Sequence, residues 1–258
     1  MLPKISIITP TLNQAPFIEE TINSVLSQNY PDLEYLIIDG GSTDGTLDIL
    51  RKYSGALKWI SESDNGQINA INKGLQRLNG NVCAYLNSDD IYTPNTLLKV
   101  GEFFRSNPEA QILTGKCINI DIEGREIRPI ITKYKNFWLR LGNERNLKIL
   151  NFISQPATFW RKKLINEIGF FNPEYRFAMD YDYWLRISQS HKIYFLDEYL
   201  ARFRVYPTSI TSSDSIKQFK EEYMIAKKYS DYGYRLLHKL HAFFSSLVYI
   251  NLINKKKQ

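Results

Sequence analysis

Two adjacent carboxylates, Asp89 and Asp90, follow a short apolar run at residues 82–86. Such a run between polar residues is typical of a buried strand in a parallel sheet, and ligands bind beyond the carboxyl ends of these strands. Neighbouring carboxylates repel each other unless a cation or a hydrogen-bond donor compensates them, and Mg²⁺ is often held by carboxylates and phosphate oxygens. The pair therefore suggests a metal-bound phosphate compound, although an isolated pair more often belongs to a solvated loop in which an Asp caps the next helix.

Polar residues also end the other expected strands of the N-terminal half. Residues 4–9, 33–38 and 57–62 read as strands, and helices are expected at 15–28, 46–53, 68–78 and 96–106. This alternation predicts a parallel sheet with right-handed crossovers, whose carboxyl ends share one edge. The polar residues expected there are Thr9, Pro10, Thr11, Asn13, Asp39 and Asp64. Asp39 by itself fits a helix cap as well as it fits a group that binds a base N–H or a sugar hydroxyl.

The loop at residues 39–45 is rich in glycine but does not match a known phosphate-binding loop. It lacks the lysine of the P-loop and the spacing of the dinucleotide fingerprint. A nucleotide at this edge would be held by side chains and a metal ion instead of by a glycine cradle.

Asp180 lies near the start of an expected amphipathic helix that contains Trp184, Leu185 and Ile187. A carboxylate in this position is stabilised by the helix dipole, so a capping role is one interpretation. The other is a general base that takes a proton from a sugar hydroxyl. Further along, Arg204 belongs to a segment with two arginines and several hydroxyls, which suits phosphate binding, although a solvated basic loop has the same composition.

The chain between residues 111 and 176 is less regular. We expect a strand at 111–120, a hairpin turn at 121–124 and a partner strand at 125–132, followed by a strand at 152–161 and a helix at 162–168. Residues 133–152 have no clear pattern. Helices are expected at 219–229 and 238–253, the second strongly apolar and followed by three lysines. This last helix fits an interfacial membrane helix, a packing helix or a dimer contact.

The net charge of +6 is concentrated near the C-terminus. A basic tail of this kind favours an anionic membrane surface over nucleic acid, so we expect no nucleic-acid partner, although the tail could be merely solubilising. The two cysteines lie in apolar runs, which indicates a reducing compartment. No signal peptide is expected, and no apolar run is long enough to span a bilayer.

The order of motifs resembles family 2 glycosyltransferases of the GT-A fold, and bacterial enzymes that build O-antigen and other surface polysaccharides in particular. The resemblance runs from about residue 4 to residue 211 and is carried by several motifs in sequence: Ile-Ser-Ile-Ile-Thr-Pro-Thr-Leu-Asn-Gln, Ile-Asp-Gly-Gly-Ser-Thr-Asp-Gly-Thr, Ser-Glu-Ser-Asp-Asn-Gly, Leu-Asn-Ser-Asp-Asp, Gln-Pro-Ala-Thr-Phe and Asp-Tyr-Asp-Tyr-Trp-Leu-Arg. It implies an α/β domain with a Rossmann-like, mostly parallel central sheet flanked by helices, followed here by a C-terminal helical tail.

The resemblance also implies roles for individual residues. The nucleotide-sugar would be held by the loop from Thr9 to Asn13, including Pro10 and Thr11, together with Asp39, Asp64, Asn87, Ser88, Asp89 and Arg204. Asp89 and Asp90 would bind Mg²⁺ or Mn²⁺, and Asp180 would be the catalytic base. Three positions depart from the family pattern: Asn87 replaces the first Asp of Asp-x-Asp, Met179 replaces a common acidic residue, and Tyr206 stands where some relatives have a metal-ligating His.

The implied protein is an inverting transferase that moves a sugar from a nucleotide-diphosphate-sugar, with UDP the expected nucleotide, to a glycan or a lipid-linked oligosaccharide. Residues 1–110 would bind the donor, 111–215 would bind the acceptor and carry the base, and 216–258 would form a tail that contacts the inner face of the cytoplasmic membrane. A nucleotidyltransferase on a related fold and a non-catalytic nucleotide-sugar-binding subunit are the alternatives.

Overall fold

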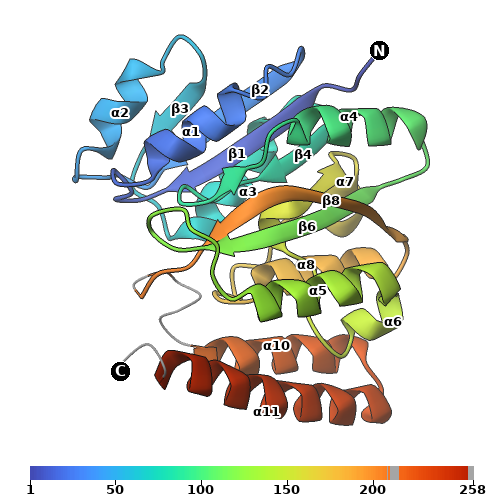
Figure 1. Cartoon of the computed structure of the whole chain (residues 1–258). Coiled ribbons are helices and arrows are strands. Elements are labelled where there is room, and N and C mark those ends of the chain that lie inside the picture. The colour runs from blue at the N-terminus through green and yellow to red at the C-terminus, as the bar shows by residue number, and fades with distance from the viewer. Residues whose placement is uncertain (208, 210–214, 255–258) are drawn as a thin grey trace.

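The computed structural model describes residues 1–207, 209 and 215–254, except for the side chains of residues 215, 216 and 247–254. One sheet of eight strands runs through the described chain in the order β3-β2-β1-β4-β7-β6-β8-β5 (Figure 1). The strands are β1 (Ile5–Thr11), β2 (Leu33–Asp39), β3 (Lys58–Ser61), β4 (Val82–Tyr85), β5 (Ile91–Tyr92), β6 (Ile112–Ile120), β7 (Thr158–Arg161) and β8 (Ile193–Arg204).

The first half of the sheet is parallel, as the sequence predicted. In the pairing register, Asp39 at the end of β2 lies beside Thr11 of β1 and Ser61 of β3. The β1–β4 and β6–β8 pairs are also parallel, whereas β7 runs antiparallel to both β4 and β6. The carboxyl ends of β1, β2, β3 and β4 therefore meet at one edge, which brings together the polar residues that follow them.

Helices such as α1 and α3 cover the sheet because each presents an apolar stripe to it. In α1 the stripe consists of Ile18, Ile22 and Val25, all fully buried. In α3, Gly74 packs so closely on β1 that an added Cβ would lie 2.8 Å from the Ile8 side chain. The helices are α1 (Ile18–Leu26), α2 (Thr46–Lys52), α3 (Gln67–Arg77), α4 (Thr96–Ser106), α5 (Pro129–Leu141), α6 (Glu144–Leu147), α7 (Leu164–Ile168), α8 (Met179–Ser188), α10 (Ser215–Tyr229) and α11 (Tyr232–Asn254), with a 3-10 turn, η1 (Gln155–Ala157).

The strand expected at 111–120 and the turn expected at 121–124 are confirmed, but the partner strand expected at 125–132 was wrong. After β6 the chain makes a single bridge between Ile120 and Glu126, and α5 then begins at Pro129. Proline favours the first turn of a helix because its fixed φ suits that position and its missing N–H would have no partner there. The partners of β6 are β7 and β8, and β8 was not expected as a strand.

Two antiparallel helices, α10 and α11, lie beneath α5 and α8 at the bottom of Figure 1. α10 packs against both α8 and α11. Within the described part of the chain, no helix combines the length and the hydrophobicity needed to cross a membrane.

Candidate functional site

Asp39 organises the loop that follows β2. Its carboxylate is fully buried and accepts hydrogen bonds from the N–H groups of Gly41 and Ser42, both at 3.0 Å, and from the Ser61 hydroxyl at 2.6 Å. The Ser42 hydroxyl in turn accepts the Asn13 N–H at 2.7 Å, and the Asn13 side chain accepts the N–H of residue 43 at 2.8 Å. The loops after β1 and β2 are therefore one hydrogen-bonded unit, in which Asn13 is exposed.

The turn after β3 joins this unit. Asp64 packs against Gly40 so closely that an added Cβ on the glycine would lie 3.1 Å from Oδ2 of Asp64. The other oxygen of Asp64 accepts the Gly66 N–H at 2.8 Å at the start of α3. The next residue, Gln67, donates to the side-chain oxygen of Asn87 at 2.7 Å. Asp39, Asp64 and Asn87 thus lie along one continuous edge of the sheet, formed by the loops after β2, β3 and β4. We call this edge the rim.

Asn87 connects the rim to the carboxylate pair. Its amide donates to Asp90 Oδ2 at 3.3 Å and to Gln155 Oε1 at 3.4 Å. Gln155, in η1, donates to the backbone oxygen of Tyr85 at 2.6 Å, which ties this amide to the end of β4. Hydrogen bonds to the side chains of Gln67, Asp90 and Gln155 therefore fix the orientation of the uncharged Asn87 amide.

Asp89 and Asp90 differ in access. Asp90 is fully buried, and its carboxylate also accepts the Arg204 N–H at 2.9 Å. Asp89 is half-buried and accepts the Tyr206 hydroxyl at 2.9 Å. Burial raises the pKa of Asp89, while burial and then the negative charge of Asp89 raise the pKa of Asp90 well above its ordinary value. A pair of buried like charges is the setting that a bound cation stabilises, and Asp89 is the carboxylate placed to reach one.

Arg204 lies beside this pair but faces protein groups. Its side chain is 1% exposed and donates to the backbone oxygens of Asp89, Asp121 and Ile122 at 2.9, 3.0 and 2.9 Å. It also forms an ion pair with Glu20 at 2.5 Å. These contacts make Arg204 a support for the Asp89–Asp90 turn, and its burial keeps the guanidinium from direct contact with a diphosphate in this structure.

Other expected donor-binding residues are buried. The Thr9 hydroxyl is fully buried and pairs with the Tyr35 hydroxyl at 3.0 Å, inside the core. Pro10, Thr11 and Ser88 are also buried, with Thr11 and Ser88 each 5% exposed. These four positions shape the backbone of the rim, whereas Asn13, Asp64, Asn87 and Asp89 present accessible polar atoms.

Asp180 lies in the first turn of α8, half-buried, and accepts the N–H of Tyr181 at 2.8 Å. Burial raises the pKa of Asp180, while Lys135 and Asn151 act in the opposite direction. Burial likewise raises the pKa of Tyr85, and the charges of Asp180 and Asp90 raise it further. Both carboxylates therefore lie near enough to Tyr85 for their charges to raise its pKa, which places Asp180 in the neighbourhood of Asp90.

The aromatic residues around Asp180 belong to the core. Tyr181, Tyr183 and Trp184 are fully buried, and the last two pack against Trp160 with centroid distances of 5.7 Å. They supply the apolar setting of Asp180 and are not available to stack on a sugar. The nearby Asp182 forms an ion pair with Arg186 at 2.9 Å, so its role is structural.

Two carboxylates of α10 reach the same region, and neither was expected there from the sequence. Glu221 accepts the N–H groups of Arg176, Phe177 and Ala178 at 2.9, 2.5 and 2.6 Å, immediately before α8. It therefore holds the segment that leads into α8 from another helix. Glu222 is 8% exposed and lies close enough to Asp180 to be affected by its charge. In sequence, this pair looks like any solvated helix face.

Glu222 predicts a pH-dependent stability. Burial raises its pKa from 4.5 to about 7, with smaller effects from Gln218, Asp180, Lys135 and Glu221. Because the folded protein holds this proton more tightly than the unfolded chain, the free energy of unfolding falls as the pH rises from about 4.5 to 7, by roughly 2–3 kcal/mol.

We therefore expect Glu222→Gln to raise the melting temperature at pH 8 by roughly 5 °C, and to leave it nearly unchanged at pH 4.5. Thermal unfolding followed by circular dichroism at both values checks this. The same shift at both pH values would show that ionisation of Glu222 is not the cause.

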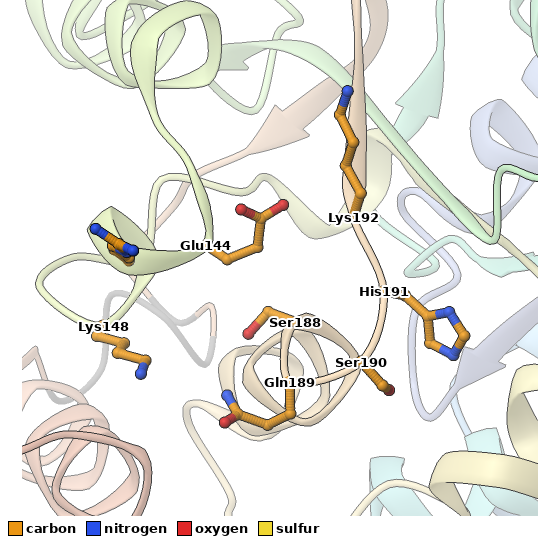
Figure 2. Close-up of a pocket in the computed structure, with 8 residues that line it drawn as sticks. Glu144, Lys148, Ser188, Gln189, Ser190, His191 and Lys192 are labelled. Carbon is orange, nitrogen blue, oxygen red and sulfur yellow. The ribbon is translucent and has the colours of Figure 1, made fainter.

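A separate surface hollow lies between α6 and the end of α8 (Figure 2). Its labelled side chains diverge: Lys192 and His191 point away from Glu144 and Gln189. It is lined by Glu144, Arg145, Lys148, Ser188, Gln189, Ser190, His191 and Lys192. It contains no residue of the rim, so we do not regard it as the reaction site.

Among the described residues, no group of three His, Cys, Asp or Glu side chains could hold a metal ion by itself. A cation at Asp89 would therefore complete its shell with ligand oxygens and water, which is how Mg²⁺ is commonly bound.

Comparisons with known proteins agree with this geometry. The sequence profile of "Glycosyl transferase family 2" matches residues 6–169. A PGL/p-HBAD biosynthesis glycosyltransferase of Mycobacterium tuberculosis is 32% identical over 192 residues, which is 71% of this chain and 69% of that protein. An uncharacterized glycosyltransferase of Rickettsia felis is 28% identical over 227 residues, 85% of this chain. The chain spans only 37% of the length of this Rickettsia protein.

Solved structures share the fold. S. aureus TarS 1-349 in complex with UDP-GlcNAc has a TM-score of 0.71 and 23% identity, covering 94% of this chain and 73% of that one. The mannosyltransferase PcManGT of Pyrobaculum calidifontis, in complex with GDP-Man and Mn²⁺, also has a TM-score of 0.71, with 20% identity, 94% coverage of this chain and 69% of that one. The expected GT-A fold is confirmed, and the chain belongs to glycosyltransferase family 2.

Proposed function

We propose that the chain is a metal-dependent, inverting transferase that moves a sugar from a nucleotide-diphosphate-sugar to a hydroxyl of a glycan or lipid-linked glycan, in surface-polysaccharide biosynthesis. The observation that carries the proposal is the single rim on which Asp39, Asp64 and Asp89 lie, with Asp180 and Asp90 both near enough to Tyr85 for their charges to raise its pKa.

In this proposal the donor lies along the rim. Its nucleoside contacts the loop around Asn13 and the Asp39 and Asp64 turns, and its diphosphate lies at Asp89. A UDP-sugar is the expected donor, and support comes from neighbours of the same fold that are in complex with UDP-GlcNAc or GDP-Man. Asn87 offers polar atoms next to the diphosphate, while Asp90 and Arg204 keep Asp89 in place.

Asp89 would hold Mg²⁺ or Mn²⁺, with Tyr206 fixing the orientation of its carboxylate. Bound there, the cation would supply the positive charge that stabilises the departing diphosphate. The structural neighbour in complex with Mn²⁺ supports this assignment. Asp90 is the weaker candidate of the expected pair because both of its oxygens have protein partners and its side chain is fully buried.

Asp180 would act on the acceptor. The acceptor oxygen bonds to the anomeric carbon as the bond from that carbon to the diphosphate oxygen breaks, and Asp180 receives the hydroxyl proton. Attack opposite the leaving group inverts the anomeric configuration. Because burial raises the pKa of Asp180, its affinity for the proton is closer to what a base needs at neutral pH.

Glu221 is a positioning residue for this base. We expect Glu221→Ala to lower kcat about tenfold while the affinity for the donor stays unchanged, because it releases three N–H groups just before Asp180. Initial rates measure the loss of kcat, and calorimetric titration measures donor affinity. Glu221→Gln keeps one accepting oxygen and should recover part of kcat; an equal loss in both variants would contradict the positioning role.

Incubation with a panel of nucleotide-sugars and Mn²⁺, with release of the nucleoside diphosphate as the readout, tests the proposed function. We expect release for one donor, faster with acceptor, and a product of inverted configuration by NMR. Donor binding without release would support the alternative of a non-catalytic subunit, which the departures at Asn87 and Met179 keep open. Formation of a nucleotide-sugar and pyrophosphate from a nucleoside triphosphate and a sugar phosphate would support the other alternative, a nucleotidyltransferase.

A further inference from the structure

The outward side of α5 is apolar. Exposed large side chains recur every three or four residues along it, which places them on one stripe: Ile130 (77% exposed), Tyr134 (42%), Phe137 (54%) and Leu141 (63%). The side facing the protein carries Thr132, Asn136 and Leu139, all buried. A surface helix of a globular domain normally has the opposite distribution, with polar residues outward.

α11 repeats this inverted pattern. Its exposed large side chains, from 48% to 80%, are Tyr232, Leu236, Leu237, Leu240, Phe243 and Phe244. On the inner side, His238 is 1% exposed and lies near the ring of Tyr181. Burial lowers the pKa of His238 to about 4, so its ring is neutral at pH 7 and carries no charge into the buried side of α11.

The two stripes adjoin each other. Tyr134 of α5 stacks on His241 of α11, with ring centroids 6.1 Å apart and an angle of 8°, and its hydroxyl lies 3.0 Å from the histidine Nε2. In Figure 1 both helices lie in the lower half of the molecule, with α10 between them in this view. We call the exposed large side chains of both stripes the outer apolar face.

The charges on these helices have one sign. Neither α5 nor α11 contains an aspartate or a glutamate. Lys133 is exposed beside Ile130 and Phe137 on the helix surface, and Lys239 is exposed beside Leu236 and Phe243. A second copy docked through the same face would bring lysines against lysines. A bilayer with anionic headgroups instead offers apolar chains to the stripes and phosphates to the lysines.

We propose that the outer apolar face docks on a bilayer surface containing anionic phospholipid. This inference rests on the proposed function and deepens it, because a membrane-docked enzyme meets a lipid-linked acceptor. Lys135, on the same helix α5, is close enough to Asp180 to lower its pKa. Docking through α5 therefore places the bilayer on the far side of the helix that carries this lysine.

Co-sedimentation with vesicles tests the proposal, using phosphatidylcholine alone and phosphatidylcholine mixed with phosphatidylglycerol. We expect the protein to pellet with the mixed vesicles and far less with phosphatidylcholine. Phe137→Glu combined with Phe243→Glu should reduce the pelleted fraction about tenfold, because charged groups replace aromatic rings that would enter the bilayer. Leu98→Glu, at a 39% exposed position on α4, is the matched control and should pellet like the wild type.

Transfer to a water-soluble acceptor should be equal in the wild type and the double variant, so failure of docking and failure of catalysis are distinguishable. The proposal is overturned if the double variant pellets like the wild type, or if binding is equal for both vesicle types. It is also overturned if the wild type stays in the supernatant and forms a dimer that the double variant abolishes, because the face would then bind a second copy.

Discussion

Asp180→Asn is expected to lower kcat on the order of 1,000-fold while the donor binds as in the wild type. The amide has nearly the same shape and can still accept the N–H of Tyr181, so α8 keeps its first turn. It cannot take a proton from the acceptor. Initial rates of nucleotide release in the presence of acceptor, paired with calorimetric titration of the donor, measure the two effects separately.

The pH profile of the wild type supplies a second readout. Because burial raises the pKa of Asp180 above 3.8, kcat should rise with pH through that higher pKa as the carboxylate loses its proton. Loss of donor binding in Asp180→Asn would contradict the assignment of the base, since Asp180 would then be part of the donor site.

Asp89→Ala is expected to remove the effect of Mn²⁺ on donor binding. In the wild type, Mn²⁺ should tighten donor binding at least about tenfold, because the cation offsets the charge of the diphosphate beside two carboxylates. Without the Asp89 carboxylate, donor affinity should be the same with Mn²⁺ and with a chelator. Calorimetric titration under both conditions measures this directly.

Two companion variants sharpen the result. Asp90→Asn should keep the response to Mn²⁺, because Asp90 is fully buried and bound by Asn87 and Arg204. Tyr206→Phe removes one hydrogen bond to the proposed metal ligand and should weaken the response by roughly tenfold. A response lost in Asp90→Asn and retained in Asp89→Ala would reassign the cation to Asp90.

The parallel half of the fold could be predicted from the sequence because its signals are local. Apolar strands and helical stripes alternate from residue 4 to residue 106, and right-handed crossovers then bring the strand ends to one edge. Asp39, Asp64 and Asp89 follow three of these strands, so the prediction that they lie at the same edge rests on the same crossovers. The prediction of a strand at residues 125–132 was wrong. Their composition is strand-like, but Pro129 favours the first turn of a helix, and α5 begins there.

The long-range contacts of the site could not be predicted in this way. Arg204 looked like a phosphate-binding residue because its surroundings in sequence are basic and rich in hydroxyls. In the fold, its donors are occupied by backbone oxygens and Glu20, which is 184 residues away. Glu221 and Glu222 reach the neighbourhood of Asp180 through helix packing, and no spacing rule connects residues 180 and 221.

We infer that Asp39, Asp89 and Asp180 belong to one site, which binds one nucleotide-sugar donor and one acceptor. A crystal structure of Asp180→Asn with a UDP-sugar and Mn²⁺ tests it most directly, because anomalous scattering locates the metal. We predict Mn²⁺ on Asp89, the diphosphate against it, the nucleoside along the Asp39 and Asp64 turns, and the anomeric carbon facing residue 180. A nucleotide bound elsewhere, for instance in the hollow of Figure 2, would contradict the claim.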